Sequence, residues 1–247
     1  SDIHANLEAL EAVLAAAAGY DKVLLLGDYV GYGADPNAVI ERVRQLPVAS
    51  VIRGNHDKVA AGIGNINEFN FIAREAITWT ARVLTPQNHA WLAELPQGPA
   101  IVDGAIEICH GTTFDEDVYV FDDLDALRSL RSAERPLCLY GHTHVPAIFQ
   151  LSGERDEAGG GVTLDFVGPP RGPSFSLSVD GGVRYLVNCG AVGQPRDGDP
   201  RAAYGLLDTD ARSVTIRRAE YDVAAAQAKV IEAGLPEVLA QRLGVGR

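Results

Sequence analysis

Apolar and polar positions follow two different periods along the first half of the chain, and together they predict α/β structure. Ala- and Leu-rich residues at helical spacing predict a helix over residues 6–18, with Asn6 as its N-cap. The short apolar runs 22–26 and 48–53 are typical of buried parallel strands. A second helix is expected to begin near Pro36, because proline suits the first turn of a helix.

The remainder of the chain is predicted to be mainly helical over 67–94 and then largely extended. A hairpin is expected over 101–110 and a short helix over 122–132. Further elements are expected as strands at 137–140, 145–151, 162–167, 174–179 and 183–188, a hairpin at 204–218 and an interrupted helix at 222–242. The glycine run at 159–161 indicates a loop rather than a domain boundary, because strands resume directly after it.

Composition narrows the class of protein. A chain of 247 residues with 47% hydrophobic residues can bury a sizeable core, so we expect a single domain over residues 1–247. No apolar run approaches the roughly 20 residues that cross a bilayer, which argues against a membrane protein. A net charge of -12 argues against bulk nucleic-acid binding. Three cysteines and the absence of a secretory leader pattern indicate a reducing, cytoplasmic setting.

Five of the six histidines lie in short motifs rich in metal-ligand residues, and only His89 lies outside them. Most of these motifs directly follow a strand-like run, where open α/β sheets place their ligands. The candidate metal ligands are Asp2, His4, Asp28, Asn55, His110, His142 and His144. Seven ligands are too many for one four-coordinate ion and fit two ions that share Asp28. Mixed nitrogen and oxygen donors favour two divalent transition-metal ions, namely Mn, Fe, Ni or Zn.

Spacing within the motifs suggests how the ligands meet. Asp2 and His4 are two residues apart, as are His142 and His144. Because side chains alternate with a period of two along a strand, we expect each pair to point to one face.

Three further residues are candidates for catalysis. His56 adjoins Asn55 and could reach a leaving group without binding metal, which makes it the candidate general acid. Asp57 is expected to accept a hydrogen bond from the His56 imidazole and fix its tautomer. Arg53 could contact a phosphoryl oxygen as a planar donor, with a surface ion pair as the equally weighted alternative.

The order of these motifs resembles the calcineurin-like metallophosphoesterase superfamily. The matching motifs are Asp2-Ile3-His4, Gly27-Asp28, Gly54-Asn55-His56-Asp57, His110 and Gly141-His142-Thr143-His144. Three stretches, Ser1–Asn6, Gly27–Gly33 and Asn188–Tyr204, further resemble its small bacterial and archaeal phosphoesterase branch.

The resemblance implies a four-layer αββα sandwich, in which two mixed β-sheets are flanked by helices and the active site lies at the carboxyl-terminal edges of the strands. One ion would take Asp2, His4, Asp28 and His144, and the other would take Asp28, Asn55, His110 and His142. A hydroxide held between the ions would attack the phosphorus of a small phosphate ester, and His56 would protonate the departing oxygen. Resemblance to the small branch slightly favours phosphodiesters over monoesters.

Two alternatives and one departure accompany this interpretation. The stretch Arg53-Gly54-Asn55-His56 also resembles protein Ser/Thr phosphatases, which would make this chain a protein phosphatase. Those enzymes, however, carry Asp-Arg where this chain has Gly31-Tyr32. A non-catalytic binding module on the same fold would be expected to have lost ligands, and here the set is full. The family also has an apolar strand before its first motif, whereas this chain begins at Ser1, so we expect one central sheet to lack a strand.

Overall fold

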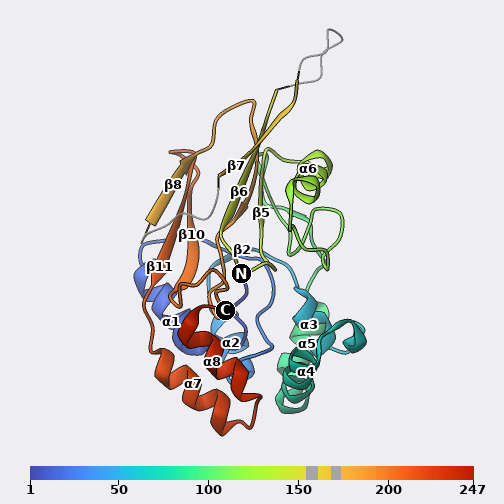
Figure 1. Ribbon diagram of the computed structural model, residues 1–247, viewed down its shortest axis with the longest axis vertical. Helices are drawn as coiled ribbons and strands as arrows, with labels where there is room; N and C mark the ends of the chain where they lie inside the picture. Colours follow the sequence, from blue (N-terminus) through green and yellow to red (C-terminus); the bar gives the residue numbers. More distant parts are fainter. Residues whose placement is uncertain (154–160, 168–173) are drawn as a thin grey trace.

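The computed structural model describes residues 1–153, 161–167 and 174–247 and shows an α/β fold with mixed sheets flanked by helices (Figure 1). The larger sheet has six strands in the order β3-β4-β5-β9-β6-β7. Their bounds are β3 Ala100–Ile101, β4 Ile106–Ile108, β5 Leu137–Tyr140, β6 Ala147–Ser152, β7 Thr163–Val167 and β9 Arg184–Asn188. Strands β4, β5 and β9 run parallel, and the outer pairs are antiparallel, so the sheet is mixed.

The remaining strands form two smaller groups. Strands β1 (Val23–Leu25) and β2 (Val48–Val51) pair in parallel, and the antiparallel group has the order β10-β11-β8. The bounds of the antiparallel group are β8 Ser174–Ser178, β10 Ala202–Asp208 and β11 Ser213–Ala219. The start of the chain lies between the groups, because the Asp2 amide donates to Gly27 and the Ser1 carbonyl accepts from Val192. The expectation that one central sheet lacks a strand stays a prediction.

Strand β5 shows why the molecule is layered. All four of its side chains are buried, and they alternate between two cores. Leu137 and Leu139 pack toward β1, β2 and β11, in the apolar layer between the sheets. Cys138 and Tyr140 face the other way and pack against helix α6. Together with helices packed outside the smaller strand groups, this gives the expected order of helix, sheet, sheet and helix.

The helices are arranged on the two outer faces and at one end of the sheets (Figure 1). Their bounds are α1 Leu7–Ala16, α2 Pro36–Val43, α3 Asn55–Ala60, η1 Ile66–Glu68 (3₁₀), α4 Phe71–Val83, α5 Pro86–Glu94, α6 Asp123–Ser132, α7 Val223–Glu232 and α8 Glu237–Val245. In the sequence, α7 and α8 are separated at 234–236, as the pattern predicts. They pack together with Tyr32 and α4, which brings the end of the chain close to the loop after β1.

Helix α3 was not predicted. It has only six residues and follows the strand β2 almost at once, so it is too short to show a helical period. The other predicted helices and strands are present, with ends shifted by a few residues. The predicted loop at 159–161 lies almost entirely outside the described residues. Cys109, Cys138 and Cys189 are free thiols. In the described part of the chain, no helix is long and apolar enough to cross a membrane.

Asn6 joins helix α1 to the loop that follows β9. Its side-chain oxygen accepts from the Ala9 amide at 3.1 Å, and its amide group donates to the Gly193 carbonyl at 2.9 Å. Asn70 caps α4 in the same way, at 3.0 Å from the Ala73 nitrogen, but it is exposed.

We therefore expect Asn6→Ala to lower the free energy of unfolding by roughly 2 kcal/mol, because a cap and a buried hydrogen bond are lost together. Asn70→Ala should cost only about 1 kcal/mol, as a cap alone. Urea unfolding of both variants measures the difference, and equal losses would mean that the contact with Gly193 contributes nothing.

Candidate metal centre

The candidate ligands lie on loops whose backbone adopts an unusual conformation. Eight non-glycine residues of the described chain have positive φ, and seven of them belong to these loops. The seven are Asp2, His4, Ala5, Asp28, Tyr32, His142 and His144. Left-handed backbone costs a non-glycine residue on the order of 1–3 kcal/mol and persists only where the surroundings impose it. This concentration of strain marks the carboxyl ends of β1 and β5 as a functional site.

The conformation corrects one expectation from the sequence. Asp2 and His4 have φ values of 54° and 49°, and His142 and His144 have values of 66° and 61°. None of the four lies in a strand. The side chains are thus brought together by left-handed turns, and the prediction that strand alternation aligns them was wrong.

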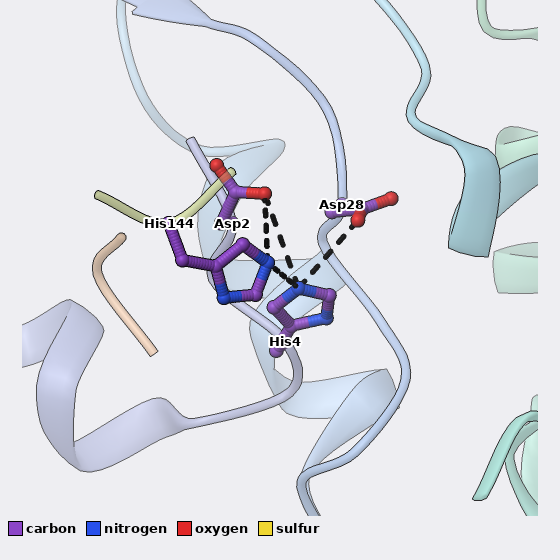
Figure 2. A group of neighbouring side chains, drawn as sticks. All are labelled: Asp2, His4, Asp28 and His144. Carbon is purple, nitrogen blue, oxygen red and sulfur yellow. Dashed lines mark hydrogen bonds and ion pairs between the residues drawn. The ribbon is translucent and has the colours of Figure 1, made fainter. Parts of the chain in front are cut away.

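Four of the candidate ligands form one cluster, drawn in Figure 2. Asp2, His4, Asp28 and His144 each place one ligand atom within 4.8 Å of the others, and all four are buried. His144 Nε2 lies 3.2 Å from Asp2 Oδ1, and His4 Nε2 lies 3.5 Å from Asp28 Oδ2. Ligands held about 2.1 Å from one ion stand roughly 3.0–3.5 Å apart. The spacing therefore fits a single bound cation.

A second cluster shares Asp28. It is formed by Asp28, His110 and His142, again with ligand atoms within 4.8 Å of one another. Asn55 joins it, because its Oδ1 lies 3.2 Å from His110 Nε2. Asp28 Oδ2 lies 3.4 Å from His110 Nε2, and the same oxygen is the one that faces His4. The other oxygen accepts from the His56 amide at 2.9 Å, so Oδ2 is the atom available to both clusters.

Backbone carbonyls fix the orientation of all four imidazoles. The Nδ1 atoms of His4, His110 and His144 donate to the backbone carbonyls of Val30, Leu26 and Gln194, respectively. The three distances are 3.0, 2.8 and 2.7 Å. His142 uses Nε2 instead and donates to Asp117 at 3.1 Å. In each neutral ring the other nitrogen is then an acceptor with a lone pair, as a metal-ligating histidine requires.

These lone pairs need a positive charge between them. His4 Nε2 and His144 Nε2 lie 3.0 Å apart, and burial lowers the pKa of both imidazoles, so neither supplies a proton at neutral pH. Burial also opposes charge on His110, but the Asp28 carboxylate raises its pKa to about 10. Without metal, a proton on His110 therefore lies beside Asp28, where a metal cation would be bound. The donor set fits two divalent cations.

Asp57 has a different role from the one expected. Its carboxylate accepts hydrogen bonds from the backbone amides of Asp28, Tyr29, Val30 and Gly54, at 2.7 to 3.2 Å. It makes no hydrogen bond to the His56 ring, whose Nδ1 has no partner among the described residues. The predicted Asp57–His56 hydrogen bond is wrong, because four peptide amides occupy the carboxylate. Asp57 instead anchors the left-handed turn that carries Asp28.

His56 is enclosed by rings rather than by carboxylates. The rings of Tyr32, Phe69 and His4 lie 4.5, 4.7 and 4.8 Å away, measured between centroids. Burial lowers the pKa of its imidazole to about 4. Gly31 permits this packing, since a Cβ at that position would lie 2.3 Å from His56 Nδ1.

The Arg53 side chain is hydrogen-bonded to other residues and is not free to contact a substrate at the candidate metal centre. Its guanidinium donates twice to Glu116, from Nε at 3.1 Å and from Nη2 at 2.9 Å, and once to Gln97. This is the ion pair that the sequence left as the alternative to a phosphate contact. A role in substrate binding for Arg53 stays a prediction, which the bond to Glu116 disfavours.

Arg196 lies beside the candidate ligands, on the loop that follows β9. Its amide donates to the His144 carbonyl at 3.2 Å, and its guanidinium lies 5.6 Å from the centre of the Tyr32 ring. Nη2 donates to Gln194 at 3.0 Å, and among the described residues the side chain makes no ion pair. Its charge acts on the pKa of His56, Tyr32 and Tyr119, so it faces the cluster from the loop after β9. In the sequence, Arg196 lies within Asn188–Tyr204, one of the stretches that resemble the small phosphoesterase branch.

Known proteins are similar to this chain in sequence and in structure. The profile of the calcineurin-like phosphoesterase superfamily domain matches residues 1–212. The uncharacterized protein MJ0912 of Methanocaldococcus jannaschii is 35% identical over 257 residues, covering 100% of this chain and 96% of the relative.

Two solved structures have the same fold. The crystal structure of a metallophosphoesterase from Sphaerobacter thermophilus superposes with a TM-score of 0.83 at 39% identity, covering 100% of this chain and 96% of the other. The hypothetical protein PH1004 from Pyrococcus horikoshii has a TM-score of 0.75 at 20% identity, with the same coverage of 100% and 96%, and supports the fold.

Because Asp28 Oδ2 lies close to ligand atoms of both clusters, we expect Asp28→Asn to weaken metal binding at both, whereas His4→Ala should mainly affect one. Elemental analysis of the two variants after reconstitution with Mn or Zn measures the ions per chain. His89→Ala, which changes a histidine outside the motifs, is the matched control. Retention of one ion by Asp28→Asn would show that the clusters do not share this carboxylate.

Proposed function

As a member of the calcineurin-like phosphoesterase superfamily, this chain is a metal-dependent phosphoesterase, and we propose that it prefers phosphodiesters. The observation that supports hydrolysis most directly is the pair of buried clusters joined at Asp28 Oδ2. Divalent ions held there would activate water and neutralise charge on the phosphoryl oxygens. The preference for a diester rests on the similarity to the small phosphoesterases and on charge. A diester is a monoanion, and Arg196 offers one guanidinium at the clusters.

The chain's own residues would divide the remaining work. Arg196 would hold a non-bridging phosphoryl oxygen, since its charge faces the clusters and no carboxylate of the described residues pairs with it. His56 would donate a proton to the departing oxygen. Its ring is neutral without substrate, and a phosphoryl group beside it would favour the imidazolium form. Tyr32 and Phe69 would keep water away from that ring.

The protein Ser/Thr phosphatase alternative receives less support from this geometry. Tyr32, which stands where those enzymes have arginine, is only 8% exposed and packs on His4 and His56. Tyrosine carries no positive charge, so this position lacks the phosphate-binding cation of those enzymes. The guanidinium near the site is that of Arg196, which comes from another loop. The binding-module alternative is disfavoured by the complete ligand set together with His56.

A substrate screen tests the proposal. Metal-stripped protein would be reconstituted separately with Mn, Fe, Ni and Zn and assayed on a nitrophenyl phosphodiester, a nitrophenyl phosphomonoester and a phosphopeptide. We expect the diester to be hydrolysed with the highest kcat/KM and every activity to disappear on chelation. Preference for the phosphopeptide would support the phosphatase alternative, and full occupancy without turnover would support the binding module.

We expect His56→Gln to lower kcat for an alkyl phosphodiester about 10²–10⁴-fold without loss of metal, because a positioned general acid contributes that much. The loss should shrink for a nitrophenyl diester, whose leaving group needs little protonation. Activity assays and elemental analysis on the same preparation measure both. A variant that lacks one ion, or equal losses on the two esters, would contradict the assignment.

We expect Arg196→Ala to lower kcat/KM about 10- to 150-fold, since a charge-assisted hydrogen bond contributes roughly 1.5–3 kcal/mol. Arg53→Ala should leave the kinetics nearly unchanged, because its guanidinium is bound to Glu116. Steady-state kinetics of the pair on one ester provides the comparison, with Arg53→Ala as the matched control. The reverse pattern would assign the phosphoryl contact to Arg53.

A further inference from the structure

A stack of aromatic rings leads from the second ligand cluster to the molecular surface. The Tyr119 ring lies on the His142 imidazole, with centroids 3.7 Å apart and planes at 23°. The Phe121 ring lies on Tyr119 at 4.8 Å and 20°. Tyr119 is half-buried, whereas Phe121 is 80% exposed. We call Tyr119 and Phe121 the aromatic stack.

The stack is held in place although its outer ring faces water. The Phe121 amide donates to Asp125 Oδ2 at 3.1 Å, and Asp122 caps helix α6 directly after it. Between the two rings, Val120 is buried in the core beneath α6. The backbone of Phe121 is thus held by its neighbours on both sides. Exposure of a large apolar ring sacrifices about 1.5–3 kcal/mol of burial, which its stacking on Tyr119 offsets only in part.

The charges around the stack indicate which part of a substrate it receives. Asp122 and Asp123 are exposed beside Phe121, and Asp125 accepts its amide. These carboxylates repel an anion, so the phosphoryl group belongs at the ligand clusters and Arg196. The end of the stack suits an uncharged group with a flat face. Parallel rings provide a platform for a planar ring, whereas an ammonium group is bound by rings set around it as a cage.

We propose that the aromatic stack binds the base of a nucleoside, so that this chain acts on phosphate esters of nucleosides. The inference rests on the proposed function and adds its substrate class. A nucleotide carries its phosphoryl group and its base at opposite ends of a sugar. The stack is arranged in the same way, with His142 at the ligand cluster and Phe121 two ring contacts away. Any base has a flat π-face, so the stack selects for a base without selecting which one.

The test compares esters that differ in the ring but have similar leaving groups. Kinetics would be measured on the metal-reconstituted full chain with a dinucleoside phosphate and a glycerol phosphodiester, or with the corresponding monoesters. Phe121→Ala should lower kcat/KM for the nucleoside ester about 5- to 150-fold and leave the glycerol ester unchanged, since base stacking on one aromatic side chain contributes that much. Phe121→Trp should retain or raise it. Phe166→Ala, which removes an exposed ring of β7 outside the stack, should change neither.

A binding measurement separates this proposal from the proposed function. In Phe121→Trp, adenosine monophosphate should quench the new indole fluorescence relative to the wild-type background, and glycerol phosphate should not. Quenching without hydrolysis of any ester would support the stack and overturn the phosphoesterase assignment. Hydrolysis of glycerol esters without quenching would overturn the stack alone. Equal losses on both esters in Phe121→Ala, or a selective loss on a choline ester, would also overturn it.

Discussion

The mutual repulsion of lone pairs and carboxylates at the ends of β1 and β5 is the constraint on which the site depends. His4 and His144 place acceptor nitrogens 3.0 Å apart, and Asp28 Oδ2 lies close to both His4 and His110. Buried acceptors without a donor are costly, and buried charges are costlier still. The arrangement is stable only with positive charge in it. Metal binding and the stability of these loops are therefore coupled.

Hydrogen bonds from the surrounding structure stabilise these strained loops and the close approach of their acceptor atoms. Asp57 accepts four peptide amides from the two turns around Asp28, and Asn6 fastens α1 to the loop after β9. Backbone carbonyls orient the four imidazoles. The sheets supply the rigid base, because β5 is buried on both faces. Hydrogen bonds and packing thus offset the cost of seven left-handed residues.

The candidate metal ligands and the side chains around them differ in what they can recognise. The ligands form the floor of the site, and any phosphate ester could use ions held there. The side chains around them form its rim. Tyr32, Arg196 and the aromatic stack come from three separate loops and surround the clusters with rings and one guanidinium. Tyr32 packs with α7 and α8, which ties the shape of the rim to the end of the chain. Substrate preference would follow from these side chains rather than from the ligands.

The candidate ligands, the layered α/β class and most of the elements could be predicted from the sequence, because the spacing of apolar residues and the order of the motifs are local properties. How the ligands converge could not be predicted, since the left-handed turns at Asp2 and His142 are held by contacts with loops distant in the sequence, such as Asp2 with Gly27 and His142 with Asp2. The roles of Asp57, Arg53 and Arg196 were likewise decided by tertiary structure. A carboxylate or guanidinium shows its partner only when segments far apart in the chain meet, as Arg53 meets Glu116.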